Sequence, residues 1–501
     1  MISKTISGVL NGIEGIPIEI ETFISRGLPS HQIVGLPNQV IKESKERVRS
    51  AIKNAGYQFP DQRITQNMSP ANIRKEGSHL DLPIAVGILA SEFESNFAYL
   101  NSVAFVGELS LVGEIKPVKG ILSLLDGFKK AGIAHVVCPA ENVTEAKYVE
   151  GLALYPYASL ELLMKDMIAG RLIEYEDRNV PKKENPHYDM DFEDIIGQSQ
   201  AIRAVEIAAA GFFNMLLIGP PGCGKTMIAE RIATILPTLT LQEKIELTKV
   251  YSLSDENTSY DLVELRPVRA PHHSITRPSL VGGGNKLEPG EVSKAHNGVL
   301  ILDEFPEFRK EVIEALREPM VNGKIQITRN QRTADFPAGF MLVATMNPCS
   351  CGYYLSATQS CMCNIYEIRR YLNKISGPIL DRFDLHLFMD RVSLDSKACS
   401  SSRELRERIQ VAENHRRGRG QTVPNAKMGK GDINRFCNLS EEAKTMMTRY
   451  YSEGKLSMRR YDKLLKISRT IADLESVQLI ERHHIMEAMQ YQNLERLKKS
   501  L

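Results

Sequence analysis

A glycine-rich stretch near the middle of the chain has the residue types and spacing that bind phosphate. It fits G-x-x-x-x-G-K-[ST] and consists of Gly219, Pro220, Pro221, Gly222, Cys223, Gly224, Lys225 and Thr226. An apolar run at 215–218 precedes it and a helical pattern at 226–236 follows, so strand, loop and helix stand in the order that this motif requires. Backbone N–H groups would surround phosphate oxygens, with Lys225 reaching the β- and γ-phosphates and Thr226 holding Mg²⁺. The stretch through Met227 therefore predicts a nucleoside triphosphate site rather than a chance turn.

Two acidic residues follow a second apolar run. Residues 299–302 are Val-Leu-Ile-Leu, and Asp303 and Glu304 come directly after them. Ligands of parallel sheets bind beyond the carboxyl ends of the strands, where these side chains would lie. Asp303 would hold Mg²⁺ through its water shell, and Glu304 would orient and polarise an attacking water. Such a pair is often only a turn, but downstream of a complete phosphate motif it predicts hydrolysis of the nucleotide.

A polar amide ends a third apolar run, at 341–346. Asn347 can there hydrogen-bond the attacking water or the γ-phosphate. The alternative is an asparagine that begins a turn before Pro348. Together with the other parts of the site, the position favours a γ-phosphate sensor.

Two arginines stand where guanidinium groups can stabilise phosphoryl transfer. Arg382 lies between a helix end and a last strand, and Arg459 lies in the first turn of a helix that Ser457 is expected to cap. An arginine supplied across an interface can accelerate this reaction by ~10³–10⁵-fold. The alternative for either residue is a structural ion pair with a nearby acid such as Asp381 or Asp462.

Half of the cysteines gather within fifteen residues as two C-x-C pairs. They are Cys349, Cys351, Cys361 and Cys363. Two thiolate pairs at the base of a short loop suit tetrahedral Zn²⁺, which is our prediction for 349–363. Four unligated thiols and an iron–sulfur cluster are the alternatives.

Composition narrows the class of protein. The 501 residues are too many for one ordinary core, and 43% apolar and 25% charged residues are usual for a soluble globular protein. No apolar run approaches the ~18 residues that span a bilayer, and the N-terminus lacks the apolar segment of a signal peptide. We therefore expect a cytoplasmic protein without membrane contact. A net charge of +2 neither requires nor excludes nucleic acid.

The pattern along the chain predicts an α/β protein of three domains. Residues 1–168 mix strands and helices as an α+β domain, and the polar stretch 169–188 reads as a linker. Residues 189–392 alternate strands and helices, which indicates a largely parallel sheet. Residues 393–501 are mostly helical.

Taken together, these motifs resemble the AAA+ ATPases of the magnesium-chelatase/MCM branch. The likeness rests on the phosphate loop, the acidic pair, Asn347, Arg382, Arg459 and residues 194–198. A narrower likeness is to the ComM/YifB family. It rests on residues 33–37, 269–274, 282–293, 295–300 and 346–352. The resemblance covers essentially the whole chain.

The resemblance implies an ATP-hydrolysing core that uses Mg²⁺ and assembles into a homo-oligomeric ring, most simply a hexamer. Arg382 would act in trans, as an arginine finger for the ATP site of a neighbouring copy. Arg459 would act as the second nucleotide sensor. The implied partner is single-stranded or branched DNA. The implied activity is branch migration or helicase action during recombination of incoming DNA. A magnesium-chelatase-like metal-insertion subunit, a protease-associated remodelling ATPase and a nucleotide-gated scaffold are the rivals.

The first domain resembles the Lon-protease-like module, which has a ribosomal S5 domain 2-like fold, and the last resembles a helical lid. In that protease a serine–lysine pair carries catalysis. Here His79 stands at the nucleophile's place and Leu122 at the lysine's, although Ser78 and Lys119 are near. We therefore expect no peptidase activity.

Two basic segments are candidates for DNA contact. A β-hairpin is expected ahead of Asn347, with Lys324, Arg329 and Arg332 on it, and the run 415–420 is expected in a loop. Either could contact phosphates, or be an ordinary solvated surface.

Overall fold

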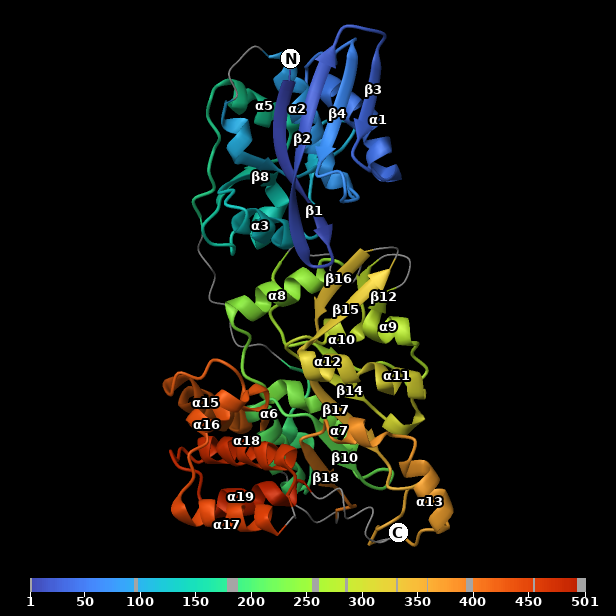
Figure 1. The fold of residues 1–501 in the computed structure, drawn as a ribbon, viewed down its shortest axis with the longest axis vertical. Coiled ribbons are helices and arrows are strands. Elements are labelled where there is room, and N and C mark those ends of the chain that lie inside the picture. Colours follow the sequence, from blue (N-terminus) through green and yellow to red (C-terminus); the bar gives the residue numbers. More distant parts are fainter. Residues whose placement is uncertain are drawn as a thin grey trace. The chain divides into compact units, whose positions relative to one another are not determined.

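The computed structural model describes residues 2–93, 98–177, 188–254, 261–283, 287–329, 332–357, 359–392, 400–453 and 456–492. The chain forms two compact units, drawn in Figure 1 with colours that follow the sequence. Unit 1 contains Met1–Glu184, Leu241–Val263 and Gln326–Phe336. Unit 2 contains Asn185–Thr240, Glu264–Ile325 and Pro337–Leu501. Residues 178–187 of the expected linker lie outside the described residues.

Unit 1 is built on a mixed seven-stranded sheet with the order β3-β4-β2-β1-β5-β8-β9. Its strands are β1 (Ile2–Asn11), β2 (Glu14–Ser25), β3 (Ser30–Val34), β4 (Arg63–Ser69), β5 (Val103–Phe105), β8 (His135–Pro139) and β9 (Ala153–Tyr157). The long β1 and β2 form an antiparallel hairpin, visible in Figure 1, whereas β1–β5, β5–β8 and β8–β9 pair in parallel. A short hairpin of β6 (Glu108–Leu109) and β7 (Ile115–Lys116) lies outside this sheet.

Helices complete unit 1. They are α1 (Gln39–Asn54), α2 (Asp81–Glu92), α3 (Ile121–Lys130), α4 (Val143–Ala146), α5 (Leu160–Ile168) and, from the middle of the sequence, α8 (Leu241–Tyr251). Helix α2 is buried along almost its whole length because its residues are apolar on every face. Its buried Asp81 accepts two hydrogen bonds from Arg47, at 2.8 and 3.1 Å, so the buried charge is paired.

Unit 2 is built on a five-stranded sheet with the order β11-β14-β17-β10-β18. The strands are β10 (Met215–Ile218), β11 (Val268–Arg269), β14 (Val299–Leu302), β17 (Met341–Met346) and β18 (Leu385–Phe388). Every neighbouring pair is parallel, which confirms the predicted sheet. The strands β10, β14 and β17 are buried throughout, which explains their uninterrupted apolar sequences.

Helices flank this sheet and form the C-terminal part of unit 2. Those before the last strand are α6 (Ser199–Gly211), α7 (Lys225–Arg231), α9 (Arg277–Val281), α10 (Glu291–Lys294), α11 (Lys310–Ala315), α12 (Arg317–Asn322), α13 (Ile365–Leu372) and α14 (Gly377–Leu380). Those after it are α15 (Ser402–Gly418), α16 (Lys430–Phe436), α17 (Glu441–Ser452), α18 (Met458–Leu474) and α19 (Arg482–Gln490). A small two-stranded sheet of unit 2 pairs β12 (Gly282–Gly283) with β13 (Glu288–Pro289). Another pairs β15 (Lys324–Arg329) with β16 (Arg332–Pro337), and Gln326–Phe336 of this pair belong to unit 1.

Two sequence expectations about helices have different outcomes. Ser457 does cap α18, because its side chain accepts a hydrogen bond from the backbone N–H of Arg460. The helix expected over 226–236 is α-helical only as far as Arg231 and then tightens into a 3₁₀ turn at Ile232–Ile235. Apolar periodicity does not distinguish these two helix types over a single turn.

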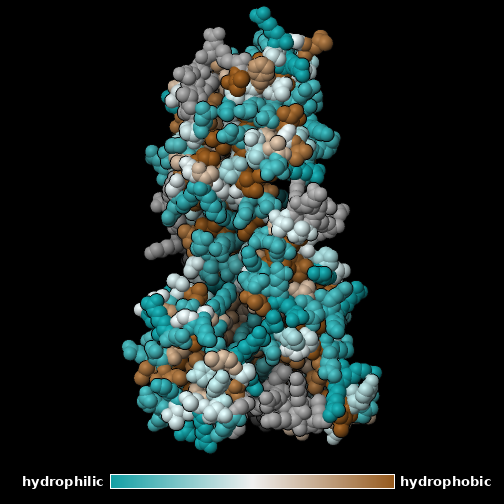
Figure 2. Space-filling model, in the orientation of Figure 1, coloured by the Kyte–Doolittle hydropathy of each residue, from teal (hydrophilic) through white to brown (hydrophobic). Residues whose placement is uncertain are grey.

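In the described part of the chain, no helix combines the length and the apolar character needed to cross a membrane. Figure 2 shows the corresponding surface on one face, where hydrophilic residues predominate and apolar ones are scattered among them.

Candidate functional site

The phosphate loop, residues 219–226, joins β10 to α7 in unit 2. Gly222 and Gly224 have φ angles of 74° and 92°, which only glycine adopts without strain. A Cβ on Gly219 would lie 2.6 Å from the carbonyl oxygen of Met389, so the backbone passes too closely for any side chain. The loop conformation therefore depends on the glycines that define the motif.

Lys225 is the first residue of α7 and its side chain is 9% exposed. Its ammonium donates hydrogen bonds to the carbonyl oxygens of Gly219 at 2.8 Å and Pro220 at 2.9 Å. It also donates to Oδ1 of Asn347 at 3.2 Å. Burial lowers the pKa of Lys225, an effect opposed by the charges of Cys223, Asp303 and Glu304. The structure thus joins the loop lysine to the residue expected to sense the γ-phosphate.

The two acids and Asn347 come together because β17 lies between β10 and β14. All three strands are parallel, so the loop after β10, the acids after β14 and Asn347 after β17 share one edge of the sheet. The hydroxyl of Thr226 lies 3.3 and 3.2 Å from the two carboxylate oxygens of Asp303. Both acids are exposed at this edge. The arrangement can hold a hydrated divalent cation beside a triphosphate.

Thr345, which the sequence motifs did not single out, also contacts both acids. Its hydroxyl donates to Oδ1 of Asp303 and accepts from the backbone N–H of Glu304 at 3.1 Å. Glu304 itself has a left-handed backbone, with φ 52° and ψ 47°. The only signal for Thr345 was a hydroxyl in an otherwise apolar strand.

Gln198, within the expected 194–198 motif, braces the other side of the loop. Its side-chain amide donates to the carbonyl oxygens of Cys223 at 3.1 Å and Asp390 at 2.7 Å. The glutamine therefore ties the phosphate loop to the chain that leaves β18.

Arg382 and Arg459 lie near each other in unit 2. Lys463 on α18 donates to the carbonyl oxygens of Asp381 at 2.6 Å and Phe383 at 2.7 Å, which flank Arg382. Arg459 is one helical turn before Lys463 and so lies on the same face of α18. Burial lowers the pKa of Arg382, and repulsion from Arg317 and Arg459 lowers it further.

The contacts of Arg382 leave much of its hydrogen-bonding capacity unused. One terminal nitrogen donates to the carbonyl oxygen of Pro378, and Nε is buried without a hydrogen-bond partner. Within the described ranges, no ion pair or hydrogen bond joins Arg382 or Arg459 to Lys225, Asp303 or Glu304. The structure groups the predicted site residues into two sets within one chain.

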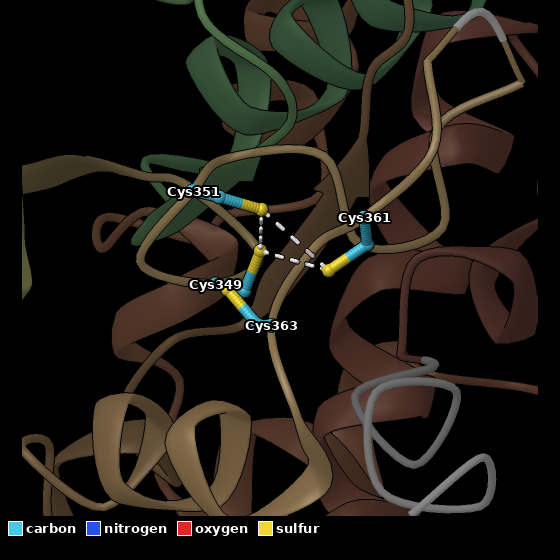
Figure 3. Close-up of side chains that lie close together, drawn as sticks. All are labelled: Cys349, Cys351, Cys361 and Cys363. Atoms are coloured by element: carbon cyan, nitrogen blue, oxygen red, sulfur yellow. Dashed lines mark hydrogen bonds between the residues drawn. The ribbon is translucent and has the colours of Figure 1, made fainter.

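The four cysteines of the loop 349–363 also come together (Figure 3). The sulfur of Cys349 lies 3.3 Å from that of Cys351 and 3.7 Å from that of Cys361, and the last two are 3.5 Å apart. The sulfur of Cys363 completes a group in which all four lie within 4.8 Å of one another. Burial opposes ionisation of Cys351, but backbone donors and neighbouring thiols lower its pKa to about 6. Such a donor set suits a soft or borderline metal ion.

The expected DNA-contact segments have different outcomes. The predicted hairpin is present as β15 and β16, but the side chains of Arg329 and Arg332 lie outside the described residues. The loop expected at 415–420 is wrong, because α15 continues to Gly418. Arg416 and Arg417 both pair with Glu413, and Arg419 pairs with Asp473. Glu413 and Asp473 therefore offset the positive charge of these three arginines.

The residues considered for peptidase chemistry have other partners. The Ser78 hydroxyl donates to the carboxylate of Glu108, and His79 is buried with its Nε2 2.8 Å from the carbonyl oxygen of Gly8. Leu122 is fully buried in α3.

Comparison with known proteins places the whole chain in one family. Family models described as magnesium chelatase subunit ChlI match residues 191–397 and 20–142, and a model of the ChlI C-terminal part matches 399–492. The chain is 38% identical over 491 residues to YifB of Salmonella typhimurium, covering 97% of this chain and 96% of that protein. It is 38% identical over 502 residues to the competence protein ComM of Haemophilus influenzae, covering 98% and 97%. The 38 kDa magnesium-chelatase subunit of Acidiphilium rubrum is 25% identical over 31% of this chain and 52% of its own length. The chain therefore belongs to the ComM/YifB family of magnesium-chelatase-like proteins.

Proposed function

We propose that this protein is an AAA+ ATPase that works as a homo-oligomeric ring, most simply a hexamer, and acts on DNA. Its activity would be branch migration or helicase action during homologous recombination of incoming DNA. The observation that carries the ATPase assignment is the meeting of Lys225, Asp303, Glu304 and Asn347 at one edge of a parallel sheet. The DNA assignment is supported by the name of the competence protein ComM, which aligns with this chain over nearly the full length of both proteins.

The site residues have distinct roles in this proposal. Residues 219–227 bind ATP, and Lys225 balances the charge of its β- and γ-phosphates. Thr226 and Asp303 would hold Mg²⁺, and their oxygen atoms, 3.2 Å apart, are the ligands this ion prefers. When bound, Mg²⁺ neutralises charge on the phosphate oxygens. Glu304 polarises the attacking water and Asn347 positions it against the γ-phosphate.

Arg382 and Arg459 would serve the ATP site of a neighbouring copy. Their proximity to each other, and the unused donors of Arg382, support a joint role in binding an anion that another chain supplies. The site is then complete only at an interface between two copies.

The proposal also includes a division of the chain into domains. We propose a Lon-protease-like domain without peptidase activity at 1–168, a linker at 169–188, an AAA+ core at 189–392 and a helical lid at 393–501. A cytoplasmic location would give the motor access to DNA.

DNA should stimulate ATP hydrolysis, and salt should weaken that stimulation. A protein that neutralises several phosphates releases counterions, so affinity for branched or single-stranded DNA should fall about tenfold or more between 50 and 200 mM salt. The measurement is steady-state ATPase activity with and without a model four-way junction, together with movement of the junction's branch point. A chain that hydrolyses ATP but binds no DNA at low salt would favour metal insertion or protein remodelling instead.

We also propose that the cysteine loop holds one Zn²⁺. Three sulfur–sulfur distances of 3.3–3.7 Å approach the edge of about 3.8 Å that a tetrahedral site with Zn–S bonds of ~2.3 Å requires. Gly352 packs so closely that a Cβ there would lie 2.7 Å from Pro221 of the phosphate loop. Metal binding would therefore stabilise the chain beside the ATP site.

Metal analysis of anaerobically purified protein should find about one zinc per chain. Cys361→Ser should lose most of it and lower the melting temperature, because three thiolates bind zinc less tightly than four. Cys437→Ser, which removes a buried thiol elsewhere, is the control and should retain zinc. Protein with no zinc, or with iron and the colour of an iron–sulfur cluster, would contradict the assignment.

A further inference from the structure

Thr345 is the one side chain that bonds to both acids of the site among the described residues. It lies near the end of β17 and is 1% exposed. Its hydroxyl donates to the carboxylate of Asp303 and accepts from the N–H of Glu304 at 3.1 Å. Since a hydroxyl has one donor and two acceptor lone pairs, both bonds can form at the same time.

The register of the sheet explains why this contact forms. Leu302 at the end of β14 pairs with Ala344 on β17, so the next residues along the two strands, Asp303 and Thr345, lie beside each other. Asp303 also accepts from the hydroxyl of Thr226 at 3.2 Å. The carboxylate is therefore held by two hydroxyl groups.

Glu304 depends on Thr345 for a different reason. A left-handed backbone is unfavourable for glutamate and persists only where the surroundings fix it. The hydrogen bond from its N–H to Thr345 is one such restraint. The next residue, Phe305, is fully buried and packs edge-to-face on Phe383, with ring centres 5.8 Å apart, which is another.

We propose that Thr345 is a positioning residue that orients Asp303 toward the Mg²⁺ site and fixes Glu304 for its role in hydrolysis. The inference rests on the proposed ATPase function and assigns a role to a residue that the sequence analysis did not single out. A valine of the same shape would leave the carboxylate of Asp303 with Thr226 as its remaining hydroxyl partner and the N–H of Glu304 without its acceptor.

The test compares Thr345→Val with Thr345→Ser and the wild type. Hydrogen-bond partners of metal ligands typically contribute ~10–100-fold to metal affinity or activity, so kcat of the valine variant should fall by that factor. The Mg²⁺ concentration that gives half-maximal activity should rise about tenfold. Binding of a fluorescent ATP analogue in EDTA should change less than about threefold, because the phosphate loop is untouched. The serine variant keeps the hydroxyl and should remain within about threefold of the wild type.

A matched control is Thr234→Val, which removes another buried hydroxyl of unit 2, one that bonds to Ser402 and the carbonyl oxygen of Arg231. It should lower the melting temperature without moving the Mg²⁺ requirement. The proposal is overturned if Thr345→Val keeps wild-type kcat and Mg²⁺ dependence, or if the serine variant is as defective as the valine variant. If the wild type hydrolyses no ATP, the proposed function fails. The Mg²⁺ dependence of binding a non-hydrolysable analogue would then still decide the role of Thr345.

Discussion

Glu304→Gln is expected to reduce ATP turnover by ~10²–10⁴-fold while nucleotide binding and nucleotide-dependent assembly persist. Glutamine has nearly the same shape, and the backbone N–H that bonds to Thr345 remains. It lacks the negative charge that polarises water. Steady-state and single-turnover hydrolysis, with assembly followed by light scattering, measure the two effects separately.

Two further variants sharpen this comparison. Lys225→Ala removes the cation that bonds to Gly219, Pro220 and Asn347, so it should lose both binding and turnover. Glu311→Gln changes an exposed acid on α11 and should turn over ATP at the wild-type rate. ATP hydrolysis near the wild-type rate by Glu304→Gln or Lys225→Ala would refute the assignment of the ATP site.

The second large effect is expected at Arg382. If its guanidinium stabilises the transferring phosphoryl group of a neighbouring copy, Arg382→Ala should lower kcat by ~10³–10⁵-fold. Nucleotide affinity should change far less, because no hydrogen bond or ion pair joins Arg382 to the phosphate loop in the described part of its own chain. Kinetics measured above the concentration at which rings form give both quantities.

Arg382→Lys tests whether the positive charge alone is sufficient, since lysine keeps the charge but lacks the planar set of donors of a guanidinium group. It should recover only a small part of the lost rate. Arg403→Ala, at an exposed surface pair with Glu407, is the control and should be as active as the wild type. Normal turnover by Arg382→Ala would show that the arginine has only a structural role.

The sequence allowed much of unit 2 to be anticipated, because the signals were contiguous. The phosphate loop, the three buried strands and the Ser457 cap each depend on residues close together in the chain, and the structure confirms the parallel sheet and the cap. The roles of the site residues stay predictions until activity is measured.

What the sequence could not supply depended on tertiary contacts. Arg382 and Arg459 are 77 positions apart, and they meet through tertiary contacts that include those of Lys463. Thr345 was missed because β17 reads as an ordinary apolar strand. The basic run was misjudged for a local reason: Glu413 precedes Arg416 and Arg417 by three and four residues, which is the spacing of helical ion pairs.

The central claim is that ATP is hydrolysed in a site completed by Arg382 of an adjoining copy. The most direct test mixes two variants that are each inactive, Glu304→Gln and Arg382→Ala. In mixed rings, about a quarter of the interfaces would pair an intact Glu304 with an intact Arg382, so the mixture should recover hydrolysis up to that fraction of the wild-type rate. A mixture that forms mixed rings yet stays as inactive as its components would contradict the claim.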